Sequence, residues 1–165
     1  MLKKLFGKGE NQKTIEIKAP VTGRYVELSD VPDPTFSEKM MGDGFAVEPS
    51  EGKVLSPIKG RIVQVFPTNH AVGIKSEEGL DVLIHIGLET VSLKGKGFDV
   101  HVKEGDKVDI GSPLVDFSLE DIQQEAKSAV TPLVLTEESQ VADISRQDVK
   151  EITGGKSTVM IVTVK

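Results

Sequence analysis

The sequence predicts an all-β fold, an antiparallel β-sandwich that also contains one short helix and short helical turns. The 16 glycines and 8 prolines are spread along the 165 residues and divide them into short segments. Most segments are rich in β-branched residues and alternate apolar with polar positions, as in Arg61-Ile62-Val63-Gln64-Val65. Only one segment has a convincing helical period, so two packed antiparallel sheets explain the pattern better than alternating strands and helices.

Each expected strand is a run of β-branched residues bounded by glycine, proline or other turn residues. In the middle of the chain, the pair Glu78-Gly79 predicts a hairpin turn, because glycine adopts positive φ at little cost. The expected strands are residues 14–18, 23–28, 44–48, 60–66, 71–76, 81–86, 113–117, 132–135 and 157–164.

The one segment with helical periodicity covers residues 118–127. Ser118 is suited to the N-cap position, and Glu120 and Asp121 place negative charge in the first turn, where it stabilises the helix dipole. We therefore expect a single short surface helix here.

Two segments of the chain resemble each other. Residues 20–26 and 57–63 share a proline, an aliphatic residue, a Gly-Arg pair and a valine in the same order. This internal similarity predicts two related β-units.

The bulk composition limits both the domain organisation and the chemistry. A chain of 165 residues fits one domain, which we place at residues 14–165 after a flexible leader of residues 1–13. The net charge of −6 disfavours binding to nucleic acid, and the chain has no cysteine for disulfides or thiolate chemistry. No window is apolar enough for a signal peptide or a membrane span, so we expect a cytoplasmic protein. Leu2, Leu5 and Phe6 could form an amphipathic turn with at most weak membrane contact.

Three histidines are the main candidates for reactive groups. His85 lies in the apolar run Val82-Leu83-Ile84-His85-Ile86, where an imidazole needs a partner to be buried at low cost. His70 opens the strand before the Glu78-Gly79 turn, so the hairpin brings it next to His85, with Cβ atoms about 5–7 Å apart. His101 is expected to be an exposed strand residue.

The paired histidines have three interpretations at this point. They could be structural, or they could act as a nucleophile and a helper, since one imidazole nitrogen reacts while the other is held by a hydrogen bond. They could also bind zinc, but zinc usually takes three or four protein ligands and no third one is placed nearby. We therefore expect no required metal, with His70 and His85 as adventitious or intermolecular zinc ligands at most.

The motifs around these histidines resemble a known family. The segments Thr68-Asn69-His70-Ala71, 82–91 and 93–98, with Val31-Pro32-Asp33 and 36–44 upstream and Lys127-Ser128 downstream, are similar to the glucose-type IIA domain of the bacterial sugar phosphotransferase system. The similarity covers roughly residues 14–165. It implies a β-sandwich of the barrel-sandwich, duplicated-hybrid type with a shallow active site around two histidines.

The resemblance also implies a role for each site residue and for two partners. His85 would accept a phosphoryl group from the phosphocarrier protein HPr and donate it to a cysteine of a IIB domain. His70 would stabilise the phosphoryl group, Thr68 would orient His70, and the backbone near Gly87 would hold the second nitrogen of His85. No cofactor is implied, and a monomer is expected.

An apolar rim around the histidines would exclude water from the labile N–P bond and contact the partner proteins. The residues assigned to it are Phe36, Met40, Met41, Phe66, Ile86 and Val91. The sequence departs from the family pattern mainly at this rim, at Pro34, Thr35, Ile84 and Ile86, which leaves partner preference open.

Three other functions fit parts of the sequence. Residues 102–114 resemble half of a biotinyl or lipoyl domain, but the lysine at Lys127 falls in the expected helix rather than in a tight hairpin. A zinc metallopeptidase would need a His-x-His pair, which His85-Ile86-Gly87 does not supply. A regulatory IIA-like protein, which signals by its phosphorylation state without a dedicated transporter, cannot be separated from a transport component by sequence alone.

Overall fold

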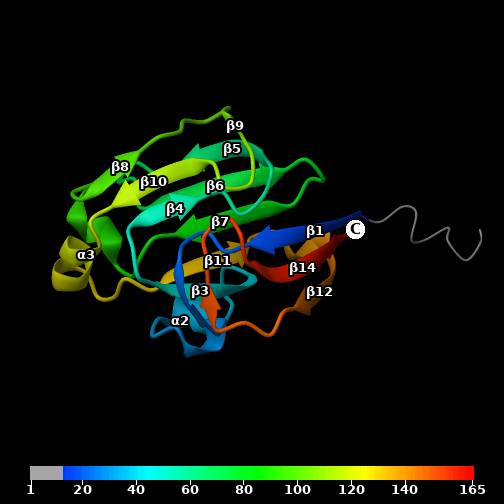
Figure 1. Ribbon diagram of the computed structural model, residues 1–165, viewed down its shortest axis with the longest axis horizontal. Coiled ribbons are helices and arrows are strands. Elements are labelled where there is room, and N and C mark those ends of the chain that lie inside the picture. Colours follow the sequence, from blue (N-terminus) through cyan, green and yellow to red (C-terminus); the bar gives the residue numbers. More distant parts are fainter. Residues whose placement is uncertain (1–12) are drawn as a thin grey trace, which may run out of the picture.

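The computed structural model describes residues 13–165, and strands form most of its regular structure (Figure 1). Eight strands form one antiparallel sheet, in the spatial order β13 (Glu151–Ile152), β2 (Gly23–Val26), β3 (Asp43–Pro49), β11 (Thr131–Leu135), β7 (Asp81–His85), β6 (Ala71–Ser76), β5 (Gly60–Val65) and β9 (Lys107–Val108). A three-stranded sheet has the order β1 (Lys13–Lys18), β14 (Thr158–Val164) and β12 (Val141–Arg146). Another has the order β4 (Lys53–Leu55), β10 (Pro113–Phe117) and β8 (Phe98–Val100). The predicted all-β sandwich is confirmed.

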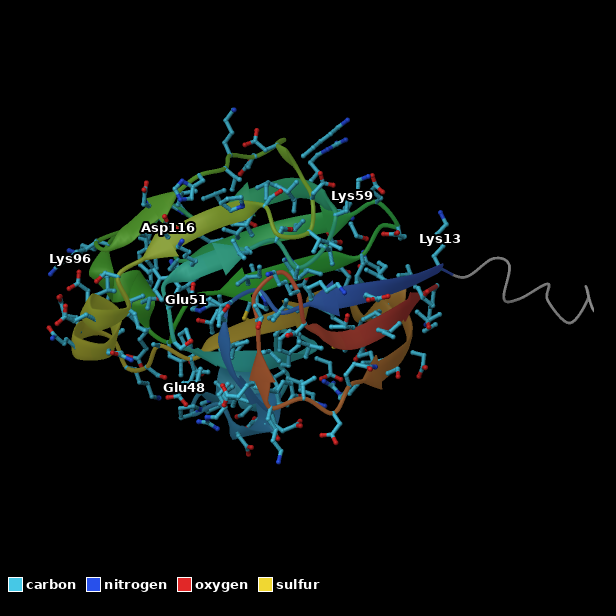
Figure 2. All side chains as sticks on the ribbon, in the orientation of Figure 1. Lys13, Glu48, Glu51, Lys59, Lys96 and Asp116 are labelled. Atoms are coloured by element: carbon cyan, nitrogen blue, oxygen red, sulfur yellow. The ribbon has the colours of Figure 1, made fainter. Side chains whose placement is uncertain are left out.

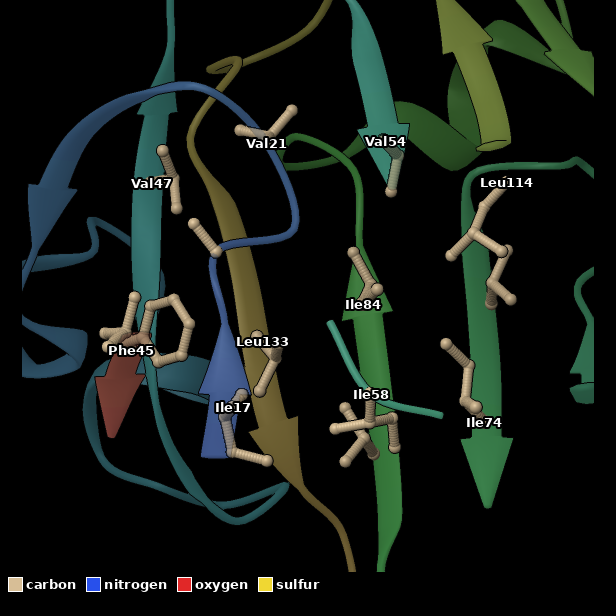
Figure 3. Close-up of a cluster of buried hydrophobic side chains, with 14 of the residues drawn as sticks. Ile17, Val21, Phe45, Val47, Val54, Ile58, Ile74, Ile84, Leu114 and Leu133 are labelled. Atoms are coloured by element: carbon tan, nitrogen blue, oxygen red, sulfur yellow. The ribbon is translucent and has the colours of Figure 1, made fainter. Parts of the chain in front are cut away.

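The main core contains buried side chains from all three sheets. Figure 3 shows Phe45, Leu133 and Ile84 on neighbouring strands of the large sheet, with Ile17 of β1 among the same cluster of side chains. Leu114 of β10 joins this cluster from the third sheet. Burying a side chain of this size contributes about 1.5–3 kcal/mol, so the alternating apolar positions of the strands hold the layers together.

A smaller apolar cluster covers part of the opposite face of the large sheet. Ala46, Leu83 and Val134 point to this face from β3, β7 and β11, and Phe36 packs against them from the connection between β2 and β3. This connection contains the helical segments η1 (Leu28–Asp30) and α2 (Pro34–Ser37). One end of the large sheet is thus covered by a short helical layer.

The expected surface helix is confirmed as α3 (Leu119–Glu125). Ser118 is its N-cap, and the Ser118 hydroxyl accepts a hydrogen bond from the backbone N–H of Asp121 at 3.2 Å. The other helical segments are single turns, η2 (Thr90–Leu93) and η3 (Glu138–Gln140), in addition to η1 and α2. These are the short helical turns that the sequence predicts.

The strand predictions match the structure in the apolar parts of the chain and fail in the polar parts. Residues 71–76 and 113–117 form strands with the expected bounds, whereas Leu28 lies in η1 rather than in the strand that precedes it. Five strands were missed, namely β4, β8, β9, β12 and β13. Four of them have only two or three residues, and β12 exposes most of its side chains, so none carries a clear alternation.

The internal similarity corresponds to two equivalent strand starts in the large sheet. Gly23 opens β2 opposite Pro49, and Gly60 opens β5 opposite Ser76. A Cβ at Gly23 would lie 2.1 Å from the carbonyl oxygen of Glu48, and a Cβ at Gly60 would lie 2.2 Å from that of Lys75. The two Gly-Arg pairs therefore serve the same close approach between strands.

Some expectations concern residues before the described part of the chain. Leu2, Leu5 and Phe6, and with them the expected amphipathic turn and most of the leader, lie outside residues 13–165. Strand β1 begins at Lys13, one residue before the expected start of the domain. Among residues 13–165, no helix is long and apolar enough to cross a membrane.

Candidate active site

The β6–β7 hairpin brings two histidines together, as the sequence predicts. His85 ends β7 and lies opposite Ala71, the first residue of β6. The backbone N–H of Ile86 donates to the carbonyl oxygen of His70 at 2.7 Å, so the pairing continues past the strand ends. The imidazole rings of His70 and His85 are 4.9 Å apart between centroids and inclined at 75°.

His70 reaches His85 because it precedes the regular part of β6. Strict alternation would turn His70 away from His85, since the residue directly opposite His85 is Ala71. The preceding turn changes this direction: the Asn69 N–H donates to the carbonyl of Phe66 at 2.7 Å, and Asn69 has a φ of 63°. Asparagine tolerates this left-handed conformation better than most residues, so the turn sequence itself contributes to the geometry of the pair.

The hydrogen bond of His85 determines which nitrogen of its neutral ring can react. Nδ1 of His85 lies 2.8 Å from the carbonyl oxygen of Gly87. A carbonyl oxygen only accepts, so Nδ1 carries the proton and Nε2 keeps its lone pair. The neutral ring is thus held in the tautomer that has a nucleophilic Nε2.

Gly87 cannot be replaced easily, because its backbone is crowded and left-handed. Its φ is 72°, and a Cβ would lie 2.6 Å from Cγ2 of Thr90 and 2.9 Å from the carbonyl oxygen of Ser128. The Thr90 hydroxyl donates to the carbonyl of Ile86 at 2.6 Å, and the Leu88 N–H donates to the carbonyl of Ser128 at 2.8 Å. These contacts fix the loop that presents the Gly87 carbonyl to His85.

His70 has a hydroxyl partner instead of a carbonyl. Oγ1 of Thr68 forms a short hydrogen bond with Nδ1 of His70. A hydroxyl can donate or accept, so this bond orients the ring and leaves Nε2 as the nitrogen without an intramolecular partner among these contacts. Thr68 thus lies where the sequence places it, beside the histidine that it was expected to orient.

Both histidines are neutral near neutral pH. Burial, and secondarily the nearby charge of His85, lowers the pKa of His70 from 6.5 to about 4. Burial also lowers the pKa of His85, although the hydrogen bond to Gly87 and the charge of Asp33 oppose this effect. Asp33 was not predicted as a site residue. Its position directly before Pro34 does indicate an N-cap, and as the N-cap of α2 it lies close enough to His85 to affect the pKa of that ring.

The expected apolar rim is only partly exposed. Met40 is 70% exposed and Val91 is 54% exposed, while Met41 and Phe66 are partly buried. Phe36 is almost completely buried, with its ring 5.2 Å from that of His85, so it supports the histidine more than it offers a contact surface. The ring of Phe66 packs 5.6 Å from that of His70.

The assignment of Ile86 to the partner surface was wrong. Ile86 has no exposed surface and belongs to the main core. The reason is the two-residue period of the strand, which turns residue 86 to the face opposite residue 85.

The third histidine lies away from the pair. His101 follows β8 and is exposed, and its Nε2 lies 3.2 Å from Oδ2 of Asp116. Together with Asp99 these residues form a group whose potential metal-ligand atoms lie within 4.8 Å of one another. Neither His70 nor His85 belongs to that group.

Comparison with known proteins gives one consistent result. The family described as phosphoenolpyruvate-dependent sugar phosphotransferase system, EIIA 1, matches residues 15–141. The glucose-specific EIIA component of Staphylococcus epidermidis is 52% identical over 165 residues, covering 99% of each chain. That of Staphylococcus aureus is 52% identical over 164 residues, with the same coverage. The glucose permease IIA structure from Mycoplasma capricolum matches with a TM-score of 0.84 and 34% identity, covering 90% of this chain and 96% of the other.

The family match and the relatives place this β-sandwich among proteins that carry a phosphoryl group on histidine. The chain belongs to the EIIA 1 family of the phosphoenolpyruvate-dependent sugar phosphotransferase system. It is a phosphotransferase that relays a phosphoryl group between HPr and a IIB domain during sugar uptake.

Proposed function

We propose that His85 is the residue that carries the phosphoryl group and that Nε2 is the bonded atom. The observation that supports this most directly is the 2.8 Å hydrogen bond from Nδ1 of His85 to the carbonyl of Gly87. In the first step, the Nε2 lone pair attacks the phosphorus of phospho-HPr, and the donor nitrogen leaves with the electron pair of the broken N–P bond. In the second step, the cysteine thiolate of the IIB domain attacks the phosphorus, and Nε2 of His85 leaves.

His70 stabilises the phosphoryl group without bonding to it. If the Thr68 hydroxyl donates to Nδ1 of His70, the neutral ring carries its proton on Nε2, which can then donate to a phosphoryl oxygen. His85 and His70 thus adopt opposite tautomers, one as nucleophile and the other as hydrogen-bond donor. Preorganised donors of this kind stabilise the charge that is spread over the transferring oxygens.

The surface around the pair binds the partner proteins, with glucose as the transported sugar. Met40 and Val91 are the exposed apolar side chains of the expected rim, and Met41 and Phe66 complete it at lower exposure. Apolar contacts there exclude water from the N–P bond during transfer. The choice of glucose rests on the names of the Staphylococcus and Mycoplasma relatives.

Replacing the acceptor tests this proposal directly. Phospho-HPr should label the unmodified protein on one histidine, and His85→Ala should abolish labelling because the nucleophile is lost. The exposed His101 provides a matched control, and His101→Ala should be labelled at the normal rate. Acid-labile phosphate that persists on His85→Ala would overturn the assignment, and peptide mapping would then locate the true acceptor.

A further inference from the structure

Three potential metal ligands share one face of the sheet formed by β4, β10 and β8. Asp116 of β10 lies directly opposite Asp99 of β8, and Figure 2 shows Asp116 on β10. His101 comes two residues after Asp99, so its side chain extends from the same face. The backbone N–H of His101 donates to the carbonyl oxygen of Leu114 at 2.8 Å, so the pairing of the two strands continues through His101. Backbone pairing therefore holds all three positions together.

This face of the sheet is open to solvent. Val115 and Phe117, on either side of Asp116 in the chain, are buried in the main core, and Val100 of β8 packs against the same core. The residues between them therefore point outward. The side chains of His101 and Asp116 are 35% and 50% exposed, and both line a surface hollow of about 560 Å³. A metal ion in solution has free access to them.

The two carboxylates are not fully compensated by charges of the protein itself. Like charges directly opposite one another in a sheet are destabilising, as Asp99 and Asp116 are here. Within the described residues, Asp116 forms a salt bridge only with His101, and Asp99 forms none. Lys53 lies opposite Asp116 on β4 and lines the same hollow, but it is not in salt-bridge contact with that carboxylate. A cation bound between the two carboxylates relieves the remaining repulsion.

The distances between the ligand atoms suit a tetrahedral metal ion. Zinc binds histidine nitrogen and carboxylate oxygen at about 2.0–2.2 Å, which places two ligand atoms roughly 3.3–3.6 Å apart. Nε2 of His101 lies 3.2 Å from Oδ2 of Asp116. The ligand atoms of all three residues lie within 4.8 Å of one another, so a rotation of the exposed Asp99 side chain brings its carboxylate into the set.

We propose that Asp99, His101 and Asp116 form a binding site for Zn²⁺ that is separate from the histidine pair. The imidazole nitrogen favours zinc over Mg²⁺ and Ca²⁺, which prefer ligand sets made of oxygen atoms. Three protein ligands leave the fourth position of the ion to water. The bound ion joins β8, a three-residue strand at the edge of its sheet, to β10. Because this ligand set depends on strand pairing, zinc binds the folded chain and stabilises it.

Zinc titration of a variant without the active-site pair tests this inference. In His70→Gln/His85→Ala, His101 is the one remaining histidine of the chain. Calorimetric titration with ZnCl₂ at neutral pH should give one ion per chain with a micromolar Kd. Adding His101→Gln or Asp99→Asn should weaken binding by at least about 10–100-fold, the loss typical for removing only an outer-shell partner of a metal site. Asp143→Asn, a matched control that removes an exposed carboxylate on β12, should leave Kd unchanged.

A second measurement uses the unmodified protein and does not depend on the folding of the double variant. The imidazole NMR signals of His101 should shift on addition of ZnCl₂ and should not shift in Asp99→Asn. An excess of about 100-fold of MgCl₂ should not reverse the shift, because Mg²⁺ binds imidazole poorly.

Three results would overturn the inference: no zinc binding by His70→Gln/His85→Ala, binding that His101→Gln leaves unchanged, or displacement of zinc by Mg²⁺. The inference does not rest on the proposed function, because none of the three ligands takes part in phosphoryl transfer. Phospho-HPr should label Asp99→Asn at the normal rate whether or not zinc binds, so a failure of this inference leaves the assignment of His85 intact.

Discussion

The two ends of the β6–β7 hairpin are made by the same strand pairing but have opposite environments. At the turn end, Lys75 and Asp81 form an exposed ion pair, and Gly79 has a φ of 96° with nothing within 4 Å of where a Cβ would lie. At the other end, His70 and His85 are packed against aromatic rings, and the left-handed Gly87 is tightly enclosed. Strand pairing places the side chains at both ends, but only at the buried end are the side chains held in one orientation and kept neutral.

The difference shows what burial adds to a polar side chain. In solvent, Lys75 can exchange its partner for water, so the ion pair is worth little. Inside the site, Nδ1 of each imidazole has one intramolecular partner, and for His85 this partner is a carbonyl that fixes the lone pair on Nε2 of the neutral ring. Changes at the enclosed end should therefore alter the orientation and protonation of the two imidazoles, and equivalent changes at the turn end should leave both as they are.

The largest effect is expected from comparing the two glycines. Gly87→Ala places a methyl group against Thr90 and Ser128, which should cost about 2–4 kcal/mol of folding free energy and displace the carbonyl that holds His85. Labelling by phospho-HPr should fall on the order of 10⁴-fold, the scale of an imidazole held in the wrong tautomer. Gly79→Ala has the same backbone penalty without the clash, so it should cost about 1 kcal/mol and leave labelling unchanged. Urea denaturation and labelling rates, measured on both variants, test the contrast.

The second effect concerns the two histidines within the enclosed end. In His70→Gln a side-chain amide can still donate a hydrogen bond, but a titratable imidazole beside the phosphoryl group is lost. Labelling by phospho-HPr should persist, whereas transfer to the IIB cysteine should slow by on the order of 10²-fold, the scale of losing one preorganised stabiliser. Labelling that fails as completely as in His85→Ala would show that the two rings act as one nucleophilic unit or that His70 is the acceptor.

The contrast between the two ends also explains what the sequence could and could not predict. The turn at Gly79 and the closeness of His70 to His85 follow from local signals, because hairpin pairing depends on neighbouring residues. The burial of Ile86 also follows from the strand period, because residues 85 and 86 point to opposite faces of the sheet. The pairing of Lys107 with Arg61 could not be predicted, since Lys107 belongs to a two-residue strand whose register depends on the tertiary fold.

The smallest effect is a pH dependence of stability that belongs to the enclosed end alone. The pKa of His70 is about 4 in the folded protein, compared with 6.5 for an ordinary histidine. Well above pH 6.5 the ring is neutral in both folded and unfolded chains, so it adds no pH dependence there. Between pH 6.5 and 4 the unfolded chain binds a proton on residue 70 that the folded chain does not, so stability falls as the pH falls.

Removing this imidazole should therefore flatten the stability profile in that window. One such group contributes a slope of at most about 1.4 kcal/mol per pH unit, and the lowered pKa of His85 adds a contribution of the same sign that remains in the variant. His101→Gln has the same number of histidines as His70→Gln, so the two variants form a matched pair. Urea denaturation at several pH values from about 7.5 to about 4 should give a smaller loss of unfolding free energy for His70→Gln than for His101→Gln. Equal losses would mean that the folded protein binds a proton on His70 as readily as the unfolded chain does, and the neutral, hydrogen-bond-donating role of His70 would then have to be abandoned.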